Sequence, residues 1–133
     1  MPVDPTVAGS PQEWLRHARS DLALSRMRKS HTVLYEHLCF HAQQAAEKAL
    51  KAVLIANGIR VQKTHDLVYL INALPPKLTV PPSFIELPLL NRYAVQQRYP
   101  GDASTVTQQH RKNAVRLAEE ALAWAEHIIS AKT

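Results

Sequence analysis

Hydrophobic residues recur at helical spacing along most of this chain, and the clearest pattern lies near its C-terminal end. The residues that share one face there are Ala114, Leu117, Ala118, Ala121, Leu122, Ala125, Ile128 and Ile129. This pattern predicts an amphipathic helix from about residue 104 or 105 to residue 131. Earlier patterns predict a first helix over residues 11–29 and a second over residues 33–57, which Gly58 can end.

The residues around these helices predict their boundaries and one shorter element. Ser10, Pro11 and Glu13 form a combination that is typical of a helix start, because Ser caps the helix and Pro suits its first position. Residues 66–73 are expected to form a short helix whose N-terminus Asp66 complements.

Prolines shape the region between the second and the last helix. Four prolines within residues 75–82 predict an extended linker, and a fourth long helix is expected over residues 83–97, interrupted near Pro88. No stretch shows the alternation of a β-strand. We therefore predict an all-α fold, an antiparallel bundle of four long helices and one short helix. It occupies residues 10–133 as a single domain, after a flexible tail over residues 1–9.

Composition and charge narrow the class of protein. Hydrophobic residues make up 46% of the 133 residues and charged residues 20%, as in ordinary globular domains. The net charge of +5 favours a nucleotide, a nucleic acid or an acidic protein as partner, although the basic residues are spread along the chain. Cys39 is the only cysteine, which excludes an internal disulfide. Because no stretch resembles a signal peptide or a membrane span, we expect a cytoplasmic protein without membrane contact.

The expected second helix has two different faces. Small side chains that favour close helix packing share one of them: Ala42, Ala45, Ala46, Ala49, Ala52 and Ala56. A wedge of roughly 80° holds polar side chains: His37, His41, Gln44, Lys48 and Lys51. We predict that His41, Lys48 and Lys51 of this wedge bind phosphate groups, the alternative being a solvated face. Glu47 and Lys51, one turn apart, are expected to support the helix by only about 0.2–0.5 kcal/mol.

Residues outside this helix are also candidates for binding a phosphate or a base. Arg92 and Arg98 are predicted to hold phosphates bidentately, and Tyr99, about two turns from Arg92, to stack on a base. Alternatively, Arg98 pairs with Asp102 and fixes the turn there. His37 and His41 have the spacing of metal ligands without further ligands nearby, so neither a metal nor a cofactor is predicted.

Several segments follow one another in a recognisable order. They are Trp14, Ala18, Asp21-Leu22, the run from Phe40 to Ala52, Gly58, His65-Asp66-Leu67, Leu90-Asn91-Arg92-Tyr93 and Arg98-Tyr99-Pro100. In this order they resemble the HEPN domain family, over roughly residues 11–131. The resemblance implies a helical bundle that forms a homodimer through its long helices. It also implies a separate minimal nucleotidyltransferase as partner, in a two-protein, toxin–antitoxin-like system.

Many members of that superfamily are metal-independent ribonucleases, with an arginine separated by four to six residues from a histidine near the start of the last long helix. Here that histidine is His110, and no arginine stands at the required spacing. Arg98 lies too far upstream, whereas Arg60 and His65 have the spacing but lie in the loop before the short helix. The resemblance therefore does not carry ribonuclease activity over to this chain.

Three hypotheses follow. The first is a non-catalytic HEPN-type module that binds a nucleotide or RNA phosphates and acts with a nucleotidyltransferase. The second is a ribonuclease toxin whose catalytic pair is Arg98 with His110, or Arg60 with His65, the histidine acting as base on a ribose 2′-hydroxyl. The third is a helical adaptor between proteins, with no ligand.

Overall fold

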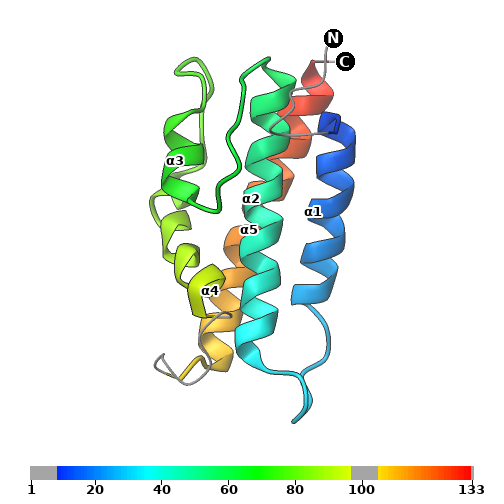
Figure 1. The fold of residues 1–133 in the computed structure, drawn as a ribbon, viewed down its shortest axis with the longest axis vertical. Coiled ribbons are helices and arrows are strands. Elements are labelled where there is room, and N and C mark those ends of the chain that lie inside the picture. The colour runs from blue at the N-terminus through cyan, green and yellow to red at the C-terminus, as the bar shows by residue number, and fades with distance from the viewer. Residues whose placement is uncertain (1–8, 97–104, 133) are drawn as a thin grey trace.

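The computed structural model describes residues 9–96 and 105–132, and the regular elements within these ranges are all helical. They are α1 (Pro11–Ser25), α2 (Tyr35–Ala56), α3 (Leu67–Asn72), the 3₁₀ turns η1 (Pro82–Ile85) and η2 (Leu87–Leu90), α4 (Asn91–Gln96) and α5 (Gln108–Ala131). Helices α1, α2 and α5 stand side by side, and the segment from α3 to α4 forms a further layer (Figure 1). The all-α bundle predicted from the sequence is confirmed.

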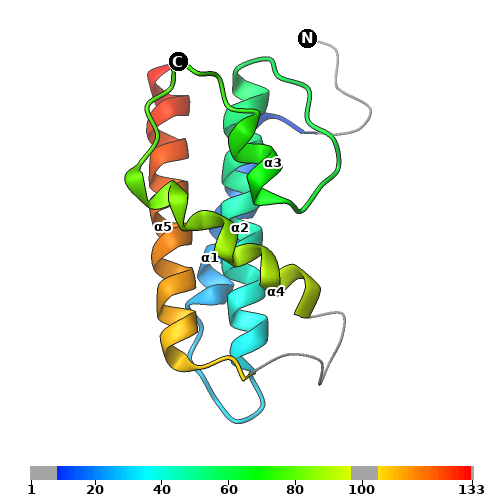
Figure 2. The ribbon, with the colours of Figure 1, turned by 90° about the vertical axis from the view of Figure 1, so that its left-hand side faces the viewer.

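Helix α2 is the centre of the fold. Its small residues Ala42, Ala45, Ala46 and Ala49 are completely buried, so α1 and α5 can pack closely against it. The segment from η1 to α4 crosses over α5 and α2 on another side (Figure 2). As a result, every α2 residue from position 38 to 56 is buried or half-buried.

The ends of α1 and α2 follow local rules, with one exception. Ser10 Oγ accepts a hydrogen bond from the Glu13 N–H at 3.1 Å, as the sequence predicts. Gly58, with a φ of +73°, ends α2, because its left-handed conformation suits glycine. Helix α1, however, ends at Ser25 rather than near residue 29. Arg111 of α5 donates hydrogen bonds to the carbonyl oxygens of Ser25 (3.1 Å) and the nearby loop, a long-range contact that local sequence patterns cannot reveal.

The expected fourth long helix is replaced by two 3₁₀ turns and the short helix α4. Pro82 and Pro88 stand at the starts of these turns, where a missing N–H costs no helical hydrogen bond. Asn91 then accepts a hydrogen bond from the Leu67 N–H at 2.9 Å and donates one to Asp66 at 3.0 Å. The start of α4 is thereby joined to the N-terminus of α3, which Asp66 caps as expected.

Helix α5 begins a few residues later than the sequence predicts. Thr107 caps it by accepting from the His110 N–H at 3.3 Å, and the His110 ring accepts from the Thr107 N–H at 2.9 Å. This reciprocal pair fixes the start of the helix. In the parts of the chain that the structure covers, none of the helices combines the length and hydrophobicity that crossing a bilayer requires.

Candidate functional site

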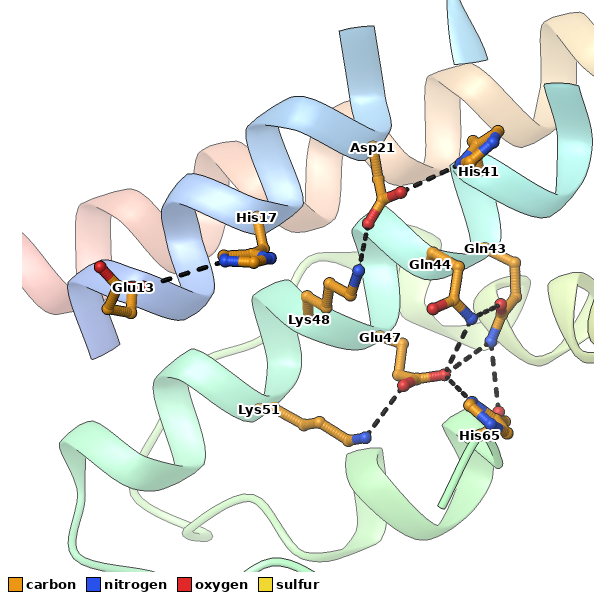
Figure 3. A network of polar contacts seen from close by, with 10 residues as sticks. All are labelled: Glu13, His17, Asp21, His41, Gln43, Gln44, Glu47, Lys48, Lys51 and His65. Carbon is orange, nitrogen blue, oxygen red and sulfur yellow. Dashed lines mark hydrogen bonds and ion pairs between the residues drawn. The ribbon is translucent and has the colours of Figure 1, made fainter. Parts of the chain in front are cut away.

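A lysine and a histidine share one carboxylate where α1 lies against α2. Asp21 of α1 accepts from Lys48 Nζ at 2.5 Å through Oδ2, and its Oδ1 lies 3.0 Å from Nδ1 of His41 (Figure 3). The Asp21 side chain is only 11% exposed, while the imidazole is 31% exposed. Packing of α1 on α2 therefore creates this group, with a buried acid and a partly open imidazole.

A second group of the same kind lies further along α2. Glu47 binds Lys51 Nζ at 2.9 Å through Oε2 and His65 Nδ1 at 2.8 Å through Oε1. The amide nitrogens of Gln43 (3.0 Å) and Gln44 (3.4 Å) also donate to Oε1. The Glu47 side chain is 3% exposed and that of Lys51 7%, whereas the His65 side chain is 53% exposed. The loop before α3 brings His65 to this position, and Gln43 holds it there by donating to its carbonyl oxygen at 3.3 Å.

The two groups give their imidazoles a defined role. A carboxylate can only accept hydrogen bonds, so each ring donates from Nδ1 and keeps Nε2 for another partner. Nε2 can donate to an anion when the ring is protonated, or accept a proton when it is neutral. Each lysine is neutralised by a carboxylate. The protonation of the two imidazoles therefore determines whether the two groups together, called the cluster below, carry a net positive charge.

The predicted basic wedge is therefore brought together, but not as a row of free cations. Lys48 and Lys51 form ion pairs with Asp21 and Glu47, so neither is a solvated ammonium. The Glu47–Lys51 pair is buried rather than an exposed helix support, and this differs from the sequence-based expectation because α1 and the loop before α3 cover it. The wedge contributes to any anion site through its imidazoles and the remaining lysine N–H groups.

The other predicted binding residues lie elsewhere. Arg92 is on α4, with its guanidinium carbon 5.3 Å from the centre of the Tyr93 ring, and it is not a member of the cluster in Figure 3. Arg98 and Tyr99 lie outside the described residues. The phosphate and base contacts predicted for these three residues stay predictions.

The candidate catalytic histidines have different surroundings. Nδ1 of His110 is used in the cap of α5, whereas His65 is held by the buried carboxylate of Glu47. Arg60 lies in the loop after α2, on the same segment as His65. His65 thus has a supporting acid, Glu47, which the spacing of Arg60 and His65 in the sequence does not indicate.

Two acidic residues of the candidate site were not identified from the sequence as members of it. Asp21 lies next to Leu22 and close to the face of α1 that Ala18 buries, and Glu47 lies among the alanines of α2. An acid at a position where the pattern predicts core is the signal that could have found them, since buried carboxylates need partners.

Burial of the Cys39 thiol disfavours the thiolate, which is the nucleophilic form of cysteine. Burial raises the pKa of this thiol to about 11, although a hydrogen bond with Tyr93 opposes the effect. Burial likewise raises the pKa of the Tyr93 hydroxyl to about 12. Both groups stay neutral at physiological pH and join α2 to α4 within the core. Elsewhere, the described part of the chain contains no group of three or more His, Cys, Asp or Glu side chains that could hold a metal ion.

Two solved structures are similar to this protein in both fold and sequence. TT1696 from Thermus thermophilus is 32% identical with a TM-score of 0.77, over 89% of this chain and 97% of that one. ST0689, described as an archaeal HEPN homologue, is 29% identical with a TM-score of 0.53, over 93% and 95% of the two chains. None of the curated proteins matches significantly. The HEPN domain model matches residues 11–128, nearly the whole chain, and the protein therefore belongs to the HEPN domain family.

Proposed function

We propose that this protein is a HEPN-type module that binds phosphate groups of a nucleotide or of RNA at the cluster around Asp21 and Glu47. The observation that carries the proposal is the pair of partly open imidazoles, His41 and His65, each held at Nδ1 by a largely buried carboxylate. Such a ring presents Nε2 in a fixed direction, so little conformational entropy is lost when it donates to a phosphate oxygen. The basic net charge of +5 also favours approach of an anion.

Binding is expected to depend on the charge of the two rings. With both rings neutral, the two lysines and two carboxylates cancel. With both protonated, the cluster carries two positive charges. A phosphate ligand is negatively charged and therefore interacts most favourably with the protonated rings. Lys48, with a side chain 22% exposed, has ammonium hydrogens beyond the one that Asp21 accepts.

Isothermal titration calorimetry with inorganic triphosphate and with ATP, at low ionic strength and without divalent metal, tests this proposal. We expect the variants His41→Ala and His65→Ala each to bind about tenfold more weakly, the usual effect of losing one charged hydrogen bond. His127→Ala is the matched control, because His127 is an exposed histidine of α5. Absence of binding to the wild-type protein would leave the helical adaptor, and equal binding by all three variants would place the ligand elsewhere.

We also propose that the protein is a homodimer that acts with a nucleotidyltransferase in a toxin–antitoxin-like pair. Membership of the family supports this proposal, and so do exposed aliphatic side chains on the η1–η2 segment, where Ile85 is 88% and Leu89 65% exposed. Light scattering on the purified protein should give twice the chain mass of 14.9 kDa. Coexpression with a nucleotidyltransferase encoded next to this gene should yield one complex on size-exclusion chromatography. A monomeric mass would contradict the homodimer, and elution without the nucleotidyltransferase would contradict the complex.

A second candidate function is that of a metal-independent ribonuclease, favoured by the contact between Glu47 and His65. A carboxylate on Nδ1 fixes the tautomer in which Nε2 is a base, and it stabilises the ring after protonation. Arg60, on the same loop, would then stabilise a phosphate intermediate. Incubation with mixed tRNA and mRNA in EDTA tests this function. Cleavage that is lost in His65→Ala but kept in His110→Ala would assign it to this pair, whereas no cleavage would leave the binding module.

A further inference from the structure

A pocket lies beside the cluster, at the N-terminal end of α1. Its volume is about 300 Å³, and its lining includes Gly9, Glu13, Trp14 and His17. This volume is at the lower end of the range of small-molecule sites. The lining provides an indole ring, an imidazole and a carboxylate, a mixture of flat apolar surface and hydrogen-bonding groups.

The indole of Trp14 has an unused hydrogen-bond donor. Its Nε1 is buried, yet no described residue accepts a hydrogen bond from it. A buried donor without an acceptor is unfavourable, and in native proteins it calls for an explanation. Gly9 passes close to this edge of the ring, because a Cβ on Gly9 would lie 3.4 Å from Nε1. With a φ of +102°, this position also favours glycine, so no side chain at position 9 presses on the indole edge.

The pocket and the cluster are parts of one polar strip along α1 and α2. Glu13, His17 and Asp21 follow one another at intervals of one helical turn on α1, and Asp21 holds Lys48 (Figure 3). At 1.5 Å per residue this stretch is about 12 Å long. Lys51, which belongs to the Glu47 group, has its Nζ 5.5 Å from the centre of the Trp14 ring.

We propose that this pocket takes the nucleobase of the ligand whose phosphates bind at the cluster, an inference that rests on the proposed function. A nucleobase has a flat surface, acceptors on its ring nitrogens or carbonyls, and N–H donors. Its acceptor would satisfy the Trp14 N–H once the Gly9 backbone shifts away from the indole edge, and its donors would bind the exposed carboxylate of Glu13, which Arg16 also contacts at 3.2 Å. The sugar and phosphates would then run along the strip towards Lys48 and His41.

The test uses Trp14 as the only tryptophan, in a Trp124→Phe protein. It is titrated separately with ATP, GTP, CTP, UTP and inorganic triphosphate at matched ionic strength in EDTA. We expect at least one nucleotide to bind about tenfold more tightly than inorganic triphosphate and to change Trp14 emission, which triphosphate does not. If triphosphate binds as tightly as every nucleotide and emission stays constant, the base pocket is overturned while the phosphate site stands. If none of the five binds, both proposals fail.

Calorimetry with variants of the otherwise wild-type protein gives a second measurement that does not depend on Trp124. Glu13→Gln replaces an exposed carboxylate, and Gly9→Ala adds a Cβ against the indole edge. Each should weaken the selected nucleotide about tenfold and leave triphosphate unchanged. Glu119→Gln, at an exposed acid of α5, is the control and should change neither. Equal nucleotide affinity in Glu13→Gln, Gly9→Ala and the control would overturn the pocket.

Discussion

Replacing Lys51 with methionine should destabilise the fold strongly, although the side chain keeps nearly the same length. The substitution leaves the Glu47 carboxylate, 3% exposed, without its ammonium partner. Removing one partner of a buried ion pair costs about 3–5 kcal/mol. We expect the lower end, about 3 kcal/mol, because His65 and Gln43 still contact Glu47 at 2.8 and 3.0 Å. For 133 residues this corresponds to a fall in melting temperature of about 10 °C.

Urea unfolding followed by circular dichroism measures this loss. A double variant, Glu47→Gln with Lys51→Met, should recover most of it, because no buried charge then remains unpaired. Lys112→Met, at an exposed position of α5, is the control and should change stability by less than about 0.5 kcal/mol. A loss below about 1 kcal/mol in Lys51→Met, or a double variant as unstable as the single one, would refute the reasoning.

Three further predictions concern the core and the helix ends. Because burial raises the pKa of Cys39 from 9.0 to about 11, the folded state holds this proton more tightly than the unfolded state. The unfolding free energy should therefore fall by up to about 3 kcal/mol as the pH rises from 9 to 11, and less so in Cys39→Ala, as urea unfolding at each pH would measure. His110→Ala removes the acceptor for the Thr107 N–H and should cost about 1 kcal/mol in thermal unfolding, with a similar loss in Thr107→Ala as comparison. Arg111→Met removes the hydrogen bonds that end α1 and should speed hydrogen exchange in the last turn of α1 while leaving the centre of α2 protected.

Sequence patterns predicted the parts of the fold that local rules decide. The cap at Ser10, the glycine end of α2 at Gly58 and the apolar stripe of α5 depend only on neighbouring residues, and the structure has all three. Sequence patterns were less informative at helix ends that depend on contacts between residues far apart in the chain. Arg111 of α5 binds the end of α1 although it lies 86 residues further along the chain, and Asn91 at the start of α4 contacts α3.

The candidate site was harder to predict for the same reason. The spacing on α2 identified His41, Lys48 and Lys51 as neighbours, and the structure has them on one side of the helix. It could not show that Asp21 of α1 would reach between two of them, since this contact depends on how the helices cross. Helical spacing therefore predicts which groups lie together, while the pairing of their charges requires the packed fold.

The enclosure of α2 has a consequence for how this sequence can vary during evolution. Residues 38–56 of this helix are all buried or half-buried, so several neighbours restrict their side-chain volumes and many substitutions there create a cavity or a clash. The outer faces of α1 and α5 meet solvent and can accept many replacements. Divergence should therefore accumulate around the bundle while the middle helix keeps its sequence.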